Sequence, residues 1–191
     1  MDNFRFEQTD MPGVCIIHSF LQEDNRGMFV KSFEKDIYKE NGIEFKCNEL
    51  FFSYSSRNVI RGMHFQTNAP QAKLVGVVCG RVFDVVVDLR NDSPTFGHWK
   101  GFYLSAANRT SLFIPRGCAH GFLALQEESI VCYNCDGLYD KKTDTGIQFN
   151  DPDINVNWPI NNINDAIVSE KDRQLMSFAT FAKSYRFEVT Q

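Results

Sequence analysis

The chain has 191 residues, 43% of them hydrophobic and 23% charged, values typical of one globular domain with a sizeable core. Its formal net charge of −4 argues against the basic surface of a nucleic-acid-binding protein. No apolar run is long enough to span a membrane, and the charged start lacks the apolar segment of a signal peptide. We therefore expect a single domain over residues 1–191, located in the cytoplasm and bound to neither membrane nor nucleic acid.

The first part of the chain predicts short strands with one short helix. The 18 phenylalanines favour a sheet-rich interior. Strands are expected over residues 14–17 and 45–53, and a turn at residues 25–27 leads into an aromatic strand that ends near Phe33. A short helix is expected over residues 37–42, ending at a glycine.

The middle of the chain has the clearest strand pattern. Residues 73–80 form an apolar run, and residues 82–89 alternate, with Asp84 and Asp88 on the face opposite Phe83. The sequence predicts a hairpin between these two strands at Gly80. Further short strands are expected in the ranges 99–104, 111–114, 120–125 and 129–133, whereas residues 165–182 are compatible with helix. Short strands separated by glycine and proline turns indicate an all-β sandwich or barrel.

The stretch from Asn58 to Val75 gathers Arg61, His64 and Lys73 within a short distance of one another. Histidine can exchange a proton near neutral pH, and lysine can stabilise an oxyanion or hold a phosphate. A surface hairpin with solvated charges is the alternative.

Other polar and aromatic residues are candidates with ordinary structural alternatives. Arg26 is either a binding residue or a solvated turn residue, and Phe29 follows it in the aromatic strand. His120 and Tyr133 are compatible with the core, and Asp172 with the start of a helix. Tyr139 is a further candidate for the site.

The sequence predicts no metal site and no redox pair. The position two residues after His64 is Gln66, so the paired histidines of a metal-binding sandwich are absent from the sequence. Cys132 and Cys135 form a lone C-x-x-C without a second pair of zinc ligands. Residues three apart on a strand point to opposite faces, so the two thiols should not meet.

Six motifs occur in an order that resembles the dTDP-4-dehydrorhamnose 3,5-epimerases, a family of cupin-type enzymes of nucleotide-sugar metabolism. The likeness extends from about Gly13 to Arg173, nearly the whole chain. In chain order the motifs are RGMH with the later KLV, VDLRNDSPTFG, IPRGCAHGF, VCY, DPDINVNWP and SEKD.

The resemblance implies a cupin-type jelly-roll (double-stranded β-helix) barrel with short C-terminal helices, acting as a homodimer without metal or other cofactor. The implied activity is epimerisation at C3, C5 or both of a nucleotide-linked 4-keto-6-deoxyhexose. His64 matches the general base, Asp172 its carboxylate partner and Tyr133 the general acid. The residues that match substrate contacts are Arg26, Phe29, Arg61, Lys73, His120, Tyr139 and Lys171.

The chemistry is coherent with these residue types. A C4 ketone acidifies the hydrogens on C3 and C5, so a base can leave an enolate whose charge lies on O4. Lys73 is suited to stabilise that oxygen. A tyrosine is still protonated at neutral pH and can return a proton to the opposite face of the ring.

The chain departs from the family pattern in three segments. Lys31 stands where a glutamate is usual, Glu49-Leu50-Phe51 replaces a Gln-x-Asn pair, and Asp144 lies near a later glutamate. A changed base or sugar preference is one hypothesis, and thymidine binding by different side chains is the other. A non-catalytic sugar-nucleotide-binding cupin and a metal-dependent cupin oxygenase are the remaining alternatives.

Overall fold

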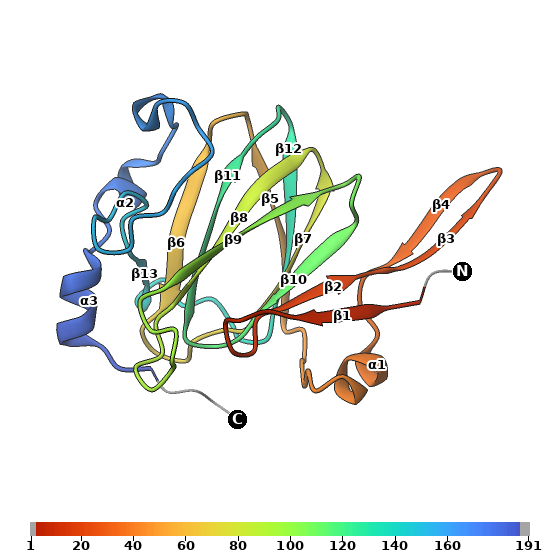
Figure 1. The fold of residues 1–191 in the computed structure, drawn as a ribbon, viewed down its shortest axis with the longest axis horizontal. Helices are drawn as coiled ribbons and strands as arrows, with labels where there is room; N and C mark the ends of the chain where they lie inside the picture. Colours follow the sequence, from red (N-terminus) through yellow and green to blue (C-terminus); the bar gives the residue numbers. More distant parts are fainter. Residues whose placement is uncertain (1–2, 188–191) are drawn as a thin grey trace.

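The computed structural model describes residues 3–187, which fold mainly into antiparallel strands (Figure 1). One sheet has six strands in the order β1-β2-β10-β7-β12-β5, and a second has five in the order β13-β6-β11-β8-β9. The bounds of the six-stranded sheet are β1 Arg5–Gln8, β2 Cys15–His18, β5 Glu49–Ser55, β7 Lys73–Cys79, β10 Thr110–Ile114 and β12 Ser129–Cys135. Those of the five-stranded sheet are β6 Ile60–Gln66, β8 Arg81–Asp88, β9 Trp99–Ser105, β11 Cys118–Ala124 and β13 Asp144–Gly146.

The two sheets face each other and exchange consecutive strands. The hairpin predicted at Gly80 is wrong, because β7 pairs with β10 and β12 whereas β8 pairs with β9 and β11. Gly80 has a φ of 73°, a conformation that suits glycine, and at this residue the chain leaves one sheet for the other. This exchange closes the sheets into the cupin-type jelly roll that the motifs predicted.

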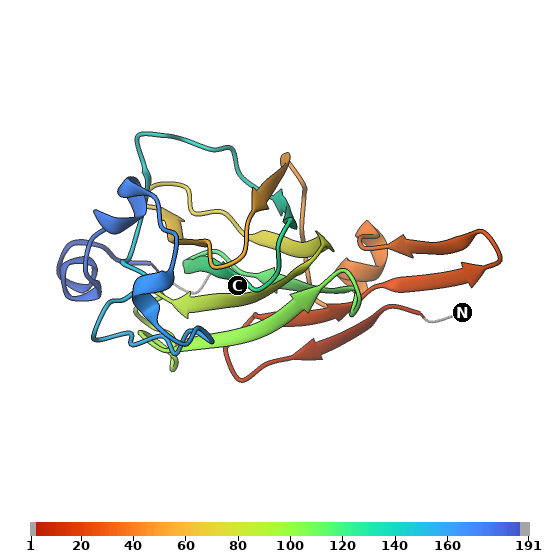
Figure 2. The ribbon, with the colours of Figure 1, turned by 90° about the horizontal axis from the view of Figure 1, so that it is seen from above.

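Strand β8 is buried on both faces from Val82 to Asp88. The predicted alternation is present: Val82 and Val86 belong to one core cluster, and Phe83, Val85 and Val87 belong to another. The second cluster includes side chains of the C-terminal segment, which covers the outside of the five-stranded sheet (Figures 1 and 2). The face with the two aspartates is therefore the inner face of the barrel.

Short helices lie outside the barrel, as expected for the C-terminal segment. Helix α1 spans Lys35–Glu40, so the helix predicted over residues 37–42 begins and ends two residues early. The helix-compatible range 165–182 is divided into shorter pieces, because Ser169 and Ser177 each cap a new helix. The pieces are α2 Glu170–Arg173 and α3 Phe178–Ser184, and the short helix η1 Ile163–Asp165 precedes them. Among residues 3–187, no helix is long and apolar enough to cross a bilayer.

Strands β3 Phe20–Asp24 and β4 Gly27–Lys31 pair only with each other and form a hairpin that projects from the barrel (Figures 1 and 2). Strands β1 and β3 were not predicted, because their residues show no clear alternation of polar and apolar side chains. The hairpin is more exposed than the barrel: Met28, Phe29 and Val30 all stand open to solvent.

Candidate active site

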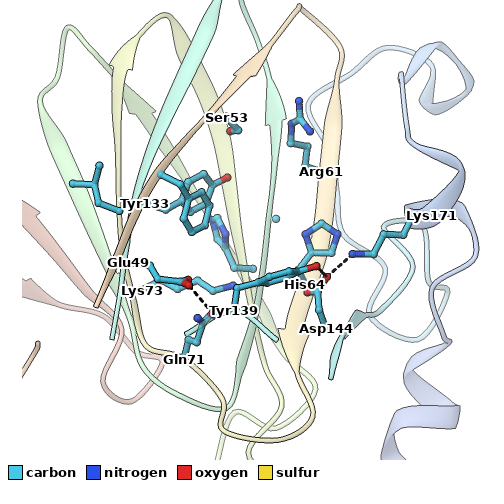
Figure 3. A pocket seen from close by; sticks show the side chains of 14 residues that line it. Glu49, Ser53, Arg61, His64, Gln71, Lys73, Tyr133, Tyr139, Asp144 and Lys171 are labelled. Atoms are coloured by element: carbon cyan, nitrogen blue, oxygen red, sulfur yellow. Dashed lines mark hydrogen bonds and ion pairs between the residues drawn. The ribbon is translucent and has the colours of Figure 1, made fainter. Parts of the chain in front are cut away.

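A cavity of about 630 Å³ lies between the two sheets, and both sheets contribute polar side chains to it (Figure 3). Lys73 and Tyr133 come from the six-stranded sheet, and Arg61, His64 and His120 come from the five-stranded sheet. The full lining is Glu49, Leu50, Phe51, Ser53, Arg61, His64, Gln71, Lys73, His120, Gly121, Tyr133, Tyr139, Asp144 and Lys171. Residues that the sequence marks separately thus meet in one place.

His64 and Asp172 form a hydrogen-bonded pair at one wall of the cavity. His64 Nε2 lies 2.8 Å from Asp172 Oδ1, and the Gly62 backbone N–H donates to Asp172 Oδ2 at 3.1 Å. Burial alone would raise the pKa of Asp172, but the hydrogen bonds from His64 and Gly62 lower it. An ionised Asp172 accepts a hydrogen bond from Nε2–H, and in this tautomer of His64 the lone pair is on Nδ1. The pair is therefore arranged to accept a proton at Nδ1.

Gly62 is required by the backbone at this point. Its φ is 108°, and a Cβ atom there would lie 2.6 Å from the His120 carbonyl oxygen and 2.7 Å from Gly121 Cα. Any side chain would push β6 away from β11 and move the N–H that holds Asp172. The glycine in the RGMH motif thus places the histidine and its carboxylate partner.

Tyr133 lies on the opposite wall, on strand β12. Its ring stacks on Phe51 at a centroid distance of 4.8 Å and meets the His120 ring edge-on at 5.7 Å. Burial raises the pKa of Tyr133, and the nearby Ser53 hydroxyl and Arg61 guanidinium oppose the shift only in part. The phenol therefore keeps its proton at neutral pH and is available as a donor.

His120 is held by Asp84, a residue that the sequence did not mark as functional. His120 Nε2 lies 2.8 Å from Asp84 Oδ2, and both side chains are buried. Asp84 points into the barrel from the inner face of β8. Two carboxylates within an otherwise apolar strand were the available signal.

Lys73 and Arg61 supply positive charge to the cavity. Burial of the Lys73 ammonium lowers its pKa, and the carboxylates of Asp144 and Asp84 oppose that effect. Arg61 is held in place by its own neighbours: Nε donates to Ser55 Oγ at 3.0 Å and Nη2 to the Tyr54 carbonyl at 2.9 Å. Anionic groups of a ligand are therefore favoured here.

A second polar group borders the cavity near Tyr139. The Tyr139 hydroxyl donates to Asp144 at 3.2 Å, its backbone N–H donates to Glu49 at 2.9 Å, and Lys171 forms an ion pair with Asp144. Desolvation would lower the pKa of Lys171, but the Asp144 carboxylate raises it. Glu49 and Asp144, noted in the sequence only as departures from a pattern, thus border the same cavity as the predicted residues.

Arg26 and Phe29 do not line this cavity. Both lie on the β3–β4 hairpin, where Arg26 pairs with Asp24 and the Phe29 side chain is 58% exposed. The structure therefore brings Arg61, Lys73, His120, Tyr139 and Lys171 together but leaves two predicted contacts on the outside.

Within residues 3–187 no group of three histidines, cysteines or carboxylates is arranged to hold a metal ion. All six cysteines are free, and on β12 the buried Cys135 alternates with the half-buried Cys132. The prediction that these two thiols point to opposite faces is confirmed.

A jelly-roll barrel whose two sheets enclose a polar cavity is the architecture of a cupin-type protein. The family model for dTDP-4-dehydrorhamnose 3,5-epimerase matches residues 8–180. The chain belongs to that family, as the motifs indicated, and is an epimerase.

Individual relatives agree with this assignment. A dTDP-4-dehydrorhamnose 3,5-epimerase from Methanothermobacter thermautotrophicus is 49% identical over 173 residues, which cover 91% of this chain and 94% of the relative. The RmlC epimerase from Legionella pneumophila, solved with dTDP-4-keto-L-rhamnose, has a TM-score of 0.92 at 34% identity and covers 98% and 100% of the two chains. ChmJ, a 3′-monoepimerase from Streptomyces bikiniensis solved with dTDP-quinovose, has a TM-score of 0.85 at 27% identity and covers 92% and 88%.

Proposed function

We propose that the protein epimerises a dTDP-linked 4-keto-6-deoxyhexose of the dTDP-4-dehydro-6-deoxy-D-glucose type at C3, C5 or both. The observation that carries the proposal is the His64–Asp172 pair on one wall of a cavity whose other wall holds Tyr133. The solved relatives that contain dTDP-sugars support the choice of nucleotide. The reaction needs no metal or nicotinamide, because the substrate already carries the ketone.

The proton transfers balance without an added reactant. His64 Nδ1 takes the proton on C3 or C5, and the electron pair of that C–H bond moves into an enolate whose charge lies on O4. The electron pair then returns to the carbon, which takes the proton of the Tyr133 hydroxyl from the opposite face. The resulting phenolate and imidazolium exchange protons with water. Asp172 stabilises the imidazolium and fixes the tautomer of His64.

The remaining cavity residues bind the substrate and stabilise the enolate. We assign Lys73 and His120 as donors to O4, since charge that develops in a dry site is best stabilised by fixed donors. Arg61 contributes to the diphosphate site, Tyr139 provides an aromatic face for the base, and Lys171 gives a further substrate contact. These assignments rest on the family pattern and on the shared cavity.

The functional unit is a homodimer in which the β3–β4 hairpin of each chain reaches its partner. The hairpin and the outer face of the six-stranded sheet expose more large apolar side chains than a monomer usually leaves to solvent. They are Met28, Phe29, Val30, Leu50, Phe52, Tyr54 and Val78. A second copy that covers them would also bring Arg26 and Phe29 to the partner's cavity, where the family pattern expects them.

The chain acts as one domain over residues 1–191 in the cytoplasm. Six free thiols suit a reducing compartment.

The test is a comparison of kcat/KM for dTDP-, CDP- and GDP-linked 4-keto-6-deoxyhexoses, followed by NMR. We expect inverted product and a preference for dTDP of at least about tenfold, since a base whose polar groups stay unpaired is strongly disfavoured. Binding without product in every case would instead identify a non-catalytic sugar-nucleotide-binding cupin. Turnover with a clear preference for another base would replace dTDP in the proposal.

A further inference from the structure

Phe51 is the cavity residue whose aromatic ring stacks on Tyr133. Phe51 on β5 and Tyr133 on β12 are direct cross-strand partners, and their rings are nearly parallel at 15°. Cross-strand neighbours of this kind restrain each other's side chains.

Because β5 lies at the edge of its sheet, Phe51 contacts Tyr133 from the side of that edge. Strand β5 is the edge of the six-stranded sheet, so β12 has β7 on one side and only β5 on the other. Tyr133 is 8% exposed while Phe51 is 45% exposed. Phe51 therefore covers Tyr133 on the open side, and the His120 ring, itself bonded to Asp84, bounds it elsewhere.

We propose that Phe51 is a positioning residue that holds the Tyr133 phenol in line with the carbon it protonates. The inference rests on the proposed function, in which Tyr133 is the acid. A proton donor must come within about 3 Å of its acceptor, and small displacements of a catalytic group lower rates steeply. Without the stacked ring, Tyr133 gains room to swing toward the edge of the sheet.

The experiment separates positioning from binding. Phe51→Leu keeps an apolar side chain and removes the aromatic plane, while Phe51→Tyr keeps the plane. Each variant is given dTDP-4-keto-6-deoxy-D-glucose in D2O, and NMR measures exchange of the C3 and C5 hydrogens and inversion separately. For Phe51→Leu we expect the ratio of exchange to inversion to rise about tenfold above the wild-type ratio. For Phe51→Tyr we expect the ratio to stay close to that of the wild type.

A role in binding alone would change KM but leave that ratio unchanged, because exchange and inversion both require bound substrate. The proposal would be overturned if Phe51→Leu had the wild-type ratio of exchange to inversion. It would also be overturned if the ratio rose as much in Phe51→Tyr as in Phe51→Leu. Tyr103→Leu is the matched control: it removes an exposed aromatic ring that contacts Phe83 on the other sheet, and it should leave the ratio as in the wild type. If the wild type itself shows neither exchange nor inversion, the proposed function fails rather than the role of Phe51.

Discussion

The two ends of the cavity differ in burial and in agreement with the family pattern. At the end where we propose that protons are transferred, Asp172, His120 and Tyr133 are each less than a tenth exposed, and all match the pattern that the motifs predicted. At the other end, Tyr139 is about half exposed, and Glu49 and Asp144 depart from the pattern. When one member of a buried hydrogen-bonded pair is replaced, the other is left without a partner, which destabilises the protein. Exposed side chains can be replaced singly, because water takes the place of the lost partner. We therefore propose that the chemistry takes place at one end and that variation in specificity lies at the other.

Removal of the base should have the largest effect on turnover. His64→Asn or Asp172→Ala should lower kcat by about 10³-fold, within the range of general acid–base catalysis. Steady-state kinetics measures the loss, and thermal unfolding checks that each variant folds. His98→Asn, at an exposed histidine outside the cavity, is the control and should retain full activity. Wild-type turnover of either variant at saturating substrate would remove that residue from the mechanism.

Removal of the acid should have the next largest effect, and it should lower inversion more than hydrogen exchange. Tyr133→Phe should lower net inversion by about 10²-fold, while His64 continues to exchange substrate hydrogens with solvent. NMR in D2O reports both quantities in one sample, and Tyr103→Phe serves as the control. Inversion at the native rate would show that another group delivers the proton.

The exposed hairpin should affect binding more than chemistry. Arg26→Ala should raise KM about tenfold through loss of a charged contact to the diphosphate. In a mixed dimer, one chain carries Arg26→Ala and the other carries His64→Asn. If the hairpin of each chain reaches the partner's cavity, one of the two sites in this dimer has both Arg26 and His64 intact. A component with the wild-type KM should therefore appear on mixing, whereas a mixture of Arg186→Ala and His64→Asn chains controls for simple dilution. No recovery in dimers shown to be mixed would contradict the exchange of hairpins.

A substitution at the variable end should change activity only a few-fold. Glu49→Gln restores the family residue and keeps an acceptor for the Tyr139 backbone N–H. We expect a change in kcat/KM of about three-fold with dTDP-sugar and a larger change with another base, since hydrogen-bonding groups decide such preferences. An effect as large as that of His64→Asn would erase the distinction between the two ends.

Metal removal should have no effect. The sequence lacks the second histidine of a metal pair, and the reaction proposed here uses only protons. Dialysis against a chelator should leave kcat unchanged. Lost activity that a divalent ion restores would favour the metal-dependent alternative.

The sequence predicts the residues of the proposed proton-transfer end better than it predicts how the strands are connected. Alternation along residues 82–89 was enough to place Asp84 and Asp88 on one face, but that both faces are buried depends on the C-terminal segment far along the chain. The Gly80 junction looked like a hairpin because local turn chemistry cannot show whether the next strand joins the same sheet. Likewise, the turn that contains Arg26 carries no sign that its hairpin projects from the barrel. Glu49 and Asp144 were visible only as departures, because contacts across the cavity are not local in sequence.

The central claim is that base and acid act on opposite faces of the substrate from facing walls of one cavity. The most direct measurement is inversion of dTDP-4-keto-6-deoxy-D-glucose in D2O by the wild-type protein, with NMR of the product. The account predicts deuterium at every inverted carbon, because the proton that arrives comes from Tyr133, which exchanges with solvent. An inverted carbon that retains the original hydrogen would mean that one group carries the same proton between the faces, and would contradict the account.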